Sequence, residues 1–219
     1  MLMALLAHAV KTETIPSNPL ARWERLPVEQ KHRVRWLGSR DQHENFKKGE
    51  RERFMAPLKT MPADIQAIVR VALYAGLRRS EIFDLRWRSV DFKNRTLTVE
   101  TSKSGKQRHV PINDALLEVL KTWRGNVLQF NPDARVFPSE KTGGRRDNLN
   151  RSWATLTKRA QLTDFPFHAC RHDAASRLVQ QGVPIAVVSR ILGHSSIAIT
   201  EQVYAHMAPE HMRDAVNLL

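Results

Sequence analysis

The stretch HACRHDAASRLVQQGVPIAVVSRILGHSSIAITEQVY, residues 168–204, predicts most of the C-terminal helical arrangement. Gly182 and Gly193 each follow a helical segment, and glycine readily adopts the left-handed backbone that ends a helix. Pro184 suits the first turn of the segment between these glycines. Ser195–Ser196 can cap the next segment through a hydroxyl oxygen. We therefore expect three short helices joined by tight turns, which bring distant polar side chains together.

Upstream of this stretch the hydrophobic period changes from helical to alternating. Ile65, Ile68, Val69, Ala72 and Leu73 share one face of a helix that opens near residue 62 and is interrupted at Gly76. Residues 96–101 alternate polar and apolar side chains, as a half-buried strand does. Residues 90–92 and 108–112 are the expected neighbouring strands, with a hairpin tip at residues 104–105. The fold class is therefore mainly α with a small three-stranded antiparallel sheet.

Further helices are expected on both sides of this region. Apolar periodicity predicts them at residues 2–10, 113–120, 148–160 and 209–219. Prolines between residues 16 and 27 argue for a connector there, and residues 38–52 are dense in charge. We expect the core to start near Met55.

The charge balance separates this chain from an ordinary globular protein. Lysine and arginine number 35 against 22 aspartate and glutamate residues, which gives a net charge of +13 and a pI of about 10.6. Such an excess favours a polyanionic partner. No run approaches the 18 or so apolar residues of a membrane span, so we expect a cytoplasmic location. Cys170 is the single cysteine, which excludes an intramolecular disulfide, and we interpret it as a packing residue.

Five short motifs combine phosphate-binding side chains with one tyrosine. In chain order they are GLRRSE at 76–81, KSGKQR at 103–108, HACRH at 168–172, LGH at 192–194 and VYAH at 203–206. An arginine fork binds two phosphate oxygens, and a histidine donates or accepts a proton. A tyrosine hydroxyl near them can attack a phosphodiester as a nucleophile. The set predicts a phosphate-binding site with a phenol beside it.

In this order and on so basic a chain, the motifs resemble the tyrosine recombinases, also called the phage integrase family. The resemblance covers about residues 32–219 and implies a 3′-phosphotyrosyl intermediate, with no cofactor, metal or ATP. It implies the following catalytic residues: Arg78, Lys103, His168, Arg171, His194 and the nucleophile Tyr204. It also implies that Glu81 orients a catalytic arginine by binding its side chain. We expect Arg79, Lys106 and Arg108 to contact DNA.

Several of these assignments have competitors within the same motifs. Arg79 competes with Arg78, whose alternative role is a surface salt bridge with Glu81, and Lys106 competes with Lys103. His168 and His172 are four residues apart, a spacing that also suits metal binding. The Cys170 side chain between them would point off that face of a helix, which argues against zinc. Members of the family usually carry serine or threonine where this chain has Asp173.

The resemblance also predicts the domains and the assembly. Residues 1–31 match the last helix of an N-terminal core-binding domain plus a linker, and residues 32–219 match the catalytic domain. The expected partners are double-stranded DNA and further copies of the chain, as a tetramer on paired DNA sites. Two other functions fit the same features: a truncated or impaired DNA-binding remnant of an integrase, and a type IB topoisomerase-like strand transferase.

Deletion of residues 209–219 is expected to weaken pairing of two DNA sites more than binding to one site. In the family this segment commonly docks on a neighbouring protomer, and here Met212, Val216 and Leu219 can line one helical face. Gel shifts with DNA of one and of two sites measure the two losses separately. An equal loss of both complexes would contradict this role for the segment.

Overall fold

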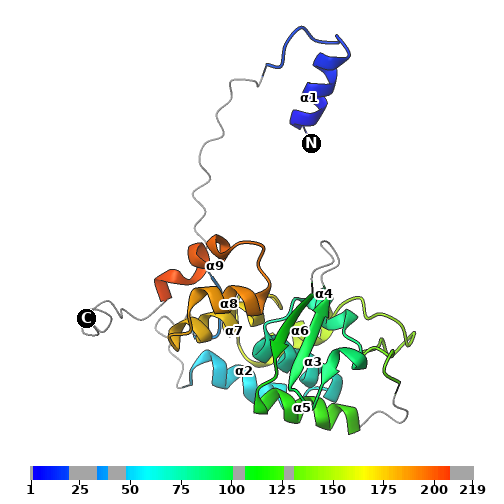
Figure 1. Cartoon of the computed structure of the whole chain (residues 1–219), viewed down its shortest axis with the longest axis vertical. Coiled ribbons are helices and arrows are strands. Elements are labelled where there is room, and N and C mark those ends of the chain that lie inside the picture. The colour runs from blue at the N-terminus through cyan, green and yellow to red at the C-terminus, as the bar shows by residue number, and fades with distance from the viewer. Residues whose placement is uncertain (1, 20–33, 39–47, 101–106, 126–130, 208–219) are drawn as a thin grey trace, which may run out of the picture. The chain divides into compact units, whose positions relative to one another are not determined.

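The computed structural model describes residues 2–19, 34–38, 48–100, 107–125 and 131–207 (Figure 1). The chain divides into two compact units, residues 1–33 and 34–219. The first unit contains helix α1 (Leu2–Lys11), which confirms the helix expected there. The expected hairpin tip, the helix at residues 209–219 and most of the charged segment at 38–52 lie outside the described residues. None of the described helices is both long and apolar enough to cross a membrane.

Eight α-helices are described in the second unit. They are α2 (Glu50–Leu58), α3 (Ala63–Ala75), α4 (Arg79–Asp84), α5 (Asp114–Gly125), α6 (Asn150–Arg159), α7 (Ala169–Gln180), α8 (Ile185–Leu192) and α9 (Ile197–Tyr204). Short 3₁₀ turns lie at Trp87–Ser89 and Ala205–Met207. Gly76 and Gly193 end α3 and α8 with φ of 62° and 68°, and the Ser196 hydroxyl caps α9 by accepting a hydrogen bond from Ala198 N. These helix ends are those that the sequence predicted.

Three antiparallel strands form the sheet in the order β1-β2-β3. They are β1 (Val90–Asp91), β2 (Thr96–Glu100) and β3 (Gln107–Pro111). Leu97 pairs with Val110, and Val99 pairs with Arg108. Because side chains alternate along a strand, Arg108 lies on the same inward face as Val110. The expected fold class, mainly α with a small three-stranded antiparallel sheet, is confirmed.

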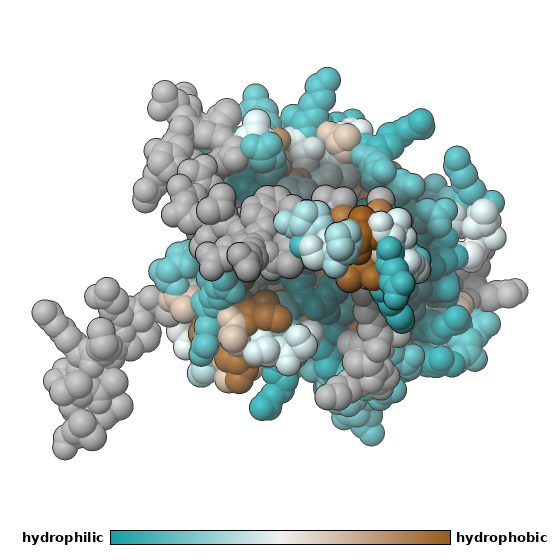
Figure 2. Space-filling model, turned by 90° about the horizontal axis from the view of Figure 1, so that it is seen from above, coloured by the Kyte–Doolittle hydropathy of each residue, from teal (hydrophilic) through white to brown (hydrophobic). Residues whose placement is uncertain are grey.

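Polar side chains dominate the face shown in Figure 2, where hydrophobic patches are small. In the part of the chain that the structure describes, the large hydrophobic side chains that stay exposed are Leu5, Val187, Ile197 and Ile199. Three of these four lie on or next to α8 and α9. The predominance of polar groups agrees with a strongly charged chain whose surface is hydrated.

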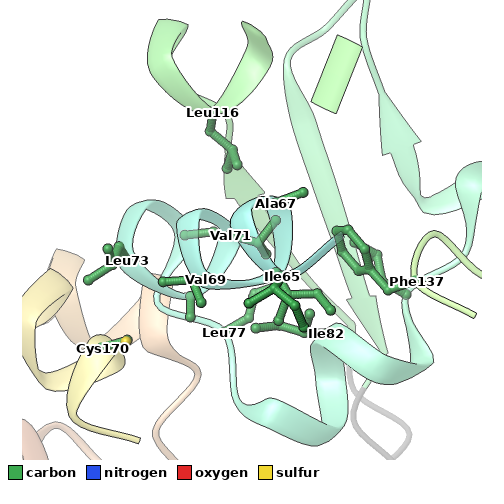
Figure 3. Packing of buried hydrophobic residues seen from close by; sticks show 14 of the residues in the cluster. Ile65, Ala67, Val69, Val71, Leu73, Leu77, Ile82, Leu116, Phe137 and Cys170 are labelled. Carbon is green, nitrogen blue, oxygen red and sulfur yellow. The ribbon is translucent and has the colours of Figure 1, made fainter. Parts of the chain in front are cut away.

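Helix α3 lies at the centre of the main hydrophobic core and packs against α5 and α7 (Figure 3). Leu116 of α5 and Cys170 of α7 approach α3 from different sides. Cys170 is fully buried, which confirms its interpretation as a packing residue. The core extends further toward the N-terminus than the expected start near Met55, because Leu37 is buried as well. The residues around 37 carry too few apolar side chains to show a period, so only packing reveals their burial.

Replacement of Gly76 by alanine is expected to lower the free energy of unfolding by about 1–3 kcal/mol. Its φ is +62°, and an added Cβ would lie 2.9 Å from Cδ2 of Leu192. Urea unfolding monitored by circular dichroism measures the loss. The matched control is Gly143→Ala, because Gly143 has a φ of +66° and an added Cβ there meets nothing within 4 Å. Similar losses in both variants would show that the contact with Leu192 is unimportant.

Candidate active site

The C-terminal end of α8 holds three arginines through three consecutive carbonyl oxygens. Arg171 of α7, which is 2% exposed, donates from Nη2 to the Leu192 carbonyl at 2.7 Å. Its Nη1 donates to the Gly76 carbonyl, also at 2.7 Å. The fixed side chain therefore spans the ends of α3 and α8. Each of these nitrogens carries a second N–H, which leaves donors for an anion.

Arg108 and Arg78 bind the carbonyls on either side of Leu192. Arg108 Nε donates to the Ile191 carbonyl at 3.0 Å, and Arg78 Nη2 donates to the Gly193 carbonyl at 3.3 Å. Partial negative charge at the C-terminus of a helix favours cations there. Gly193 must be small because an added Cβ would lie 2.7 Å from Cδ of Arg108.

Glu81 joins the same two arginines from the opposite side. Its carboxylate accepts two hydrogen bonds from Arg108, at 2.9 and 2.8 Å, and one from Arg78 Nη1 at 3.0 Å. It also caps α4 by accepting from Arg78 N at 2.8 Å. Burial raises the pKa of Glu81, but the hydrogen bonds from Arg108 and Arg78 outweigh burial, so the pKa is lowered overall. The carboxylate thus stays ionised and fixes both guanidinium groups.

The expected alternative for Arg78, a surface salt bridge, is present in altered form. Arg78 does pair with Glu81, but the Glu81 side chain is only 9% exposed while that of Arg78 is 39% exposed. The pair therefore holds a partly exposed guanidinium on a buried carboxylate. This geometry leaves one edge of Arg78 open toward solvent and a ligand.

His194 follows the three carbonyls directly and is held by α9. Its Nδ1 lies 2.7 Å from Oγ1 of Thr200, a fully buried threonine. Burial, together with the charges of Arg171 and Arg78, lowers the pKa of His194 to about 4. The ring is thus neutral near pH 7. Donation by the Thr200 hydroxyl to Nδ1 would leave the proton on Nε2, where it can meet an oxygen.

Tyr204 lies one turn after Thr200 on α9 and contacts a second histidine. Its Oη is 2.5 Å from Nδ1 of His172, and the two ring centroids are 5.9 Å apart. The His168 ring meets the His172 ring edge-on, with centroids 4.8 Å apart. Tyr204 is 1% exposed, whereas His168 is exposed. The three rings thus form a series from solvent to the buried phenol.

Burial and the arginine charges set the ionisation of these rings. Burial lowers the pKa of His172 to about 4, helped by the nearby His168 and Arg171. Burial also raises the pKa of Tyr204 to about 12, although Arg171 opposes that rise. Partial burial and the charges of Arg171 and Arg78 lower the pKa of His168. Near neutral pH the phenol keeps its proton, and the two histidines are neutral.

The DNA-contact residues expected from the sequence are placed differently from one another. Arg79 is exposed beside Arg78, as a phosphate contact requires. Arg108 instead points inward, because the register of β3 puts it on the core face, where Glu81 and the Ile191 carbonyl bind its guanidinium. A DNA contact by Arg108 stays a prediction. Lys103 and Lys106 lie outside the described residues.

Asp173, where family members usually carry serine or threonine, has partners specific to an acid. It is fully buried and accepts hydrogen bonds from Arg51 Nη1 at 2.6 Å and from Leu37 N at 3.2 Å. Burial raises its pKa, an effect opposed by Arg51. The departure therefore ties residue 37 and α2 to α7.

Two polar residues of the site were not assigned a role from the sequence. His172 was weighed only as a metal ligand, and Thr200 was not singled out. The spacing of Thr200 and Tyr204, four residues apart on one helix, is the signal that was available. It shows that they share a face, but it does not identify which histidine each hydroxyl meets.

Comparison with known proteins agrees with the fold. The model of the protein family described as "Phage integrase family" matches residues 44–211. The integrase of Salmonella phage P22 is 34% identical over 201 residues, covering 87% of this chain and 48% of the relative. The integrase of Escherichia phage 186 is 36% identical over 155 residues, covering 71% and 41%. The chain thus spans about half the length of these curated relatives.

Solved structures show the same architecture. The catalytic domain of bacteriophage HP1 integrase is 30% identical with a TM-score of 0.60, covering 77% of this chain and 90% of that chain. The XerA recombinase is 26% identical with a TM-score of 0.63, covering 77% and 62%. The fold and the ordered site define a tyrosine recombinase catalytic domain. The chain belongs to the phage integrase family, a class of DNA strand transferases.

The free energy of unfolding is expected to fall as pH drops from about 6.5 toward 4. His172 and His194 have pKa values of about 4 when folded against 6.5 as model groups, so the unfolded chain binds more protons in that window. Stability is then greatest above the unfolded pKa and declines as pH falls toward the folded one. Urea unfolding at several pH values measures this slope.

The variant His172→Asn should show a shallower decline between pH 6.5 and 4.5, because one of the three histidines with a lowered pKa (His168, His172 and His194) is gone. Glu81 does not obscure this window, since its lowered pKa matters only below the model value of 4.5. The control is His206→Asn, which removes an exposed histidine outside the cluster. An unchanged slope in the His172 variant would contradict burial of a neutral imidazole.

Proposed function

We propose that this chain is the strand-transfer part of a site-specific DNA recombinase that cleaves and rejoins DNA through Tyr204. The Tyr204 oxygen attacks a phosphodiester, its bond to phosphorus forms, and the bond from phosphorus to the 5′ oxygen breaks. The products are a 3′-phosphotyrosyl link and a free 5′ hydroxyl. Because one ester replaces another, a second 5′ hydroxyl can reverse or redirect the step without ATP.

One observation carries this proposal: Tyr204 is bound to a neutral histidine beside a guanidinium cluster. The charge of Arg171 lowers the pKa of Tyr204 against the larger effect of burial, so the two groups are close enough to interact. A tyrosine packed only for stability would not need an ordered arginine close to its hydroxyl. The arrangement supports a phenol that is activated when a phosphate enters.

The cationic groups suit the charge that develops on the two non-bridging phosphate oxygens. Arg171 and Arg78 are held by carbonyls and by Glu81, so little reorganisation is needed when charge appears. His194 can donate from Nε2 to the same phosphate. Removal of one such preorganised donor typically costs about 3–4 kcal/mol of barrier. We assign protonation of the leaving 5′ oxygen to Lys103, following the family resemblance.

Double-stranded DNA is the proposed partner. The net charge of +13 favours a polyanion, and Arg79 offers an exposed guanidinium beside Arg78. The Tn1549 transposon integrase, which shares the fold at 21% identity and a TM-score of 0.63, was solved in complex with circular intermediate DNA. The XerH recombinase, at 20% identity and a TM-score of 0.61, was solved bound to its difH substrate.

The remaining expectations from the family complete the proposal. We assign residues 1–31 to the end of an N-terminal core-binding domain plus its linker, and residues 32–219 to the catalytic domain. The active assembly would be a tetramer on two DNA sites, and its location the cytoplasm, where the DNA of a bacterium or an infecting phage lies. The deletion of residues 209–219 described above tests the assembly.

The chain is expected to form a covalent adduct with nicked duplex DNA that loses its 5′-hydroxyl fragment after cleavage. Loss of the fragment prevents religation, so the 3′-phosphotyrosyl link accumulates and a denaturing gel shows it without added metal. The variant Tyr204→Phe should abolish the adduct. The other tyrosine provides the matched control, since Tyr74→Phe should leave adduct formation within about twofold of the unmodified chain.

Two results would contradict the proposal. An adduct that persists in Tyr204→Phe would assign the nucleophile to another residue. Absence of any adduct on a DNA that the chain binds at low salt would favour a binding remnant over a strand transferase.

A further inference from the structure

His172, rather than the expected catalytic residue His168, contacts the hydroxyl of Tyr204. The distance from Nδ1 of His172 to Oη is 2.5 Å. The His168 ring lies edge-on against the His172 ring and is itself exposed. The hydroxyl therefore has a bonded partner that is not the histidine of the His-x-x-Arg pair.

The ionisation of the two groups fixes the direction of this hydrogen bond. The pKa of His172 is lowered to about 4 and that of Tyr204 is raised to about 12, both chiefly by burial. Near neutral pH the phenol is the donor and the neutral imidazole has one acceptor nitrogen. Nδ1 is that acceptor, and the imidazole proton lies on Nε2. Nδ1 of His172 is therefore already within hydrogen-bonding distance of the phenol proton that must leave.

We propose that His172 positions Tyr204 and takes up its proton when the phenol attacks DNA. This inference rests on the proposed strand-transfer function. In the step, the Oη–H proton moves to Nδ1 of His172 as the bond from Oη to phosphorus forms. The bond from phosphorus to the 5′ oxygen breaks, and that oxygen receives a proton from the acid of the site, assigned to Lys103. His168 is then free to meet the phosphate from its exposed position.

Proton transfer is unfavourable before DNA binds, which keeps the resting phenol neutral. The groups that act on His172 are His168 and Arg171, and Arg171 also acts on Tyr204. A phosphodiester entering this cluster brings a negative charge, which offsets Arg171 and favours a cationic imidazole. Bond formation to phosphorus also removes the basicity of the phenol oxygen. Transfer is therefore coupled to attack rather than completed beforehand.

Thr200, the other hydroxyl residue of the site on α9, holds the helix in place without the contact that positions the Tyr204 phenol. Thr200 binds His194 one turn before Tyr204, so α9 is anchored to the site independently of His172. Loss of the His172 acceptor should therefore leave α9 docked and DNA binding intact. It should change the chemical step selectively.

The experiment compares His172→Asn with the unmodified residue in a Tyr74→Phe background, where Tyr204 is the single tyrosine. Asparagine can place an oxygen acceptor near the position of Nδ1 but is not basic. Single-turnover adduct formation on nicked duplex DNA should slow by about 10²–10³-fold, a typical contribution of general base catalysis. The dissociation constant for uncleaved DNA should change less than about threefold, since no phosphate contact is removed.

Replacement of Tyr204 by fluorotyrosine distinguishes proton uptake from a structural role. The fluorinated phenol is more acidic and depends less on a base, so the deficit of His172→Asn should shrink by about tenfold. A purely structural defect would be the same with both phenols, and that result would overturn the proposal. Full activity of His172→Asn would also overturn it.

A measurement on the unmodified histidine covers the case in which the variant fails to fold. Nitrogen NMR of ¹⁵N-histidine-labelled protein should show the His172 ring with its proton on Nε2 and an unprotonated, hydrogen-bonded Nδ1. The opposite tautomer would overturn the proposal. An inactive unmodified chain, by contrast, would count against the strand-transfer function itself and is recognised by the absence of any adduct.

Discussion

The site depends on the C-terminal end of α8, where three consecutive carbonyls each accept a hydrogen bond from a different arginine. The carbonyls of Ile191, Leu192 and Gly193 bind Arg108, Arg171 and Arg78. These arginines come from β3, α7 and the start of α4. Mutual repulsion would spread three guanidinium groups apart in water, but the helix end and the Glu81 carboxylate offset that repulsion. The packing of α8 therefore also brings together the three arginines, two of which we propose to act on phosphate.

Helix α9 completes the site because its two inward hydroxyls each meet a histidine. Thr200 orients His194, and Tyr204 meets His172. Both histidines are kept neutral by burial among cations, so each has one nitrogen to accept and one to donate. The proposed nucleophile is thus held protonated and sheltered until a negatively charged substrate changes the local balance. Buried, fully bonded polar groups of this kind fix geometry closely, because an unpaired one would be costly.

Prediction from sequence succeeded where a local rule applies. Gly76, Gly193 and the Ser196 cap ended or began helices as expected, since backbone conformation near a glycine or a cap depends on few neighbours. It did not predict that Arg108, expected to contact DNA, would bind Glu81. A basic residue near a hairpin tip is usually solvated, and only strand register shows that it faces inward with Val110.

The amino-acid sequence by itself determined the fold class, the helix ends and the order of the arginine, histidine and tyrosine motifs. These follow from hydrophobic period, backbone propensity and residue chemistry, all of which act over a few residues. Tertiary structure alone decided that Tyr204 bonds to His172, that Thr200 orients His194, and that Asp173 binds Arg51. Each of the contacts made by Tyr204 and Asp173 joins elements more than 30 residues apart, so it depends on how helices pack. Spacing along the chain determines which side chains share a face of a helix or strand, whereas packing determines which residues they contact.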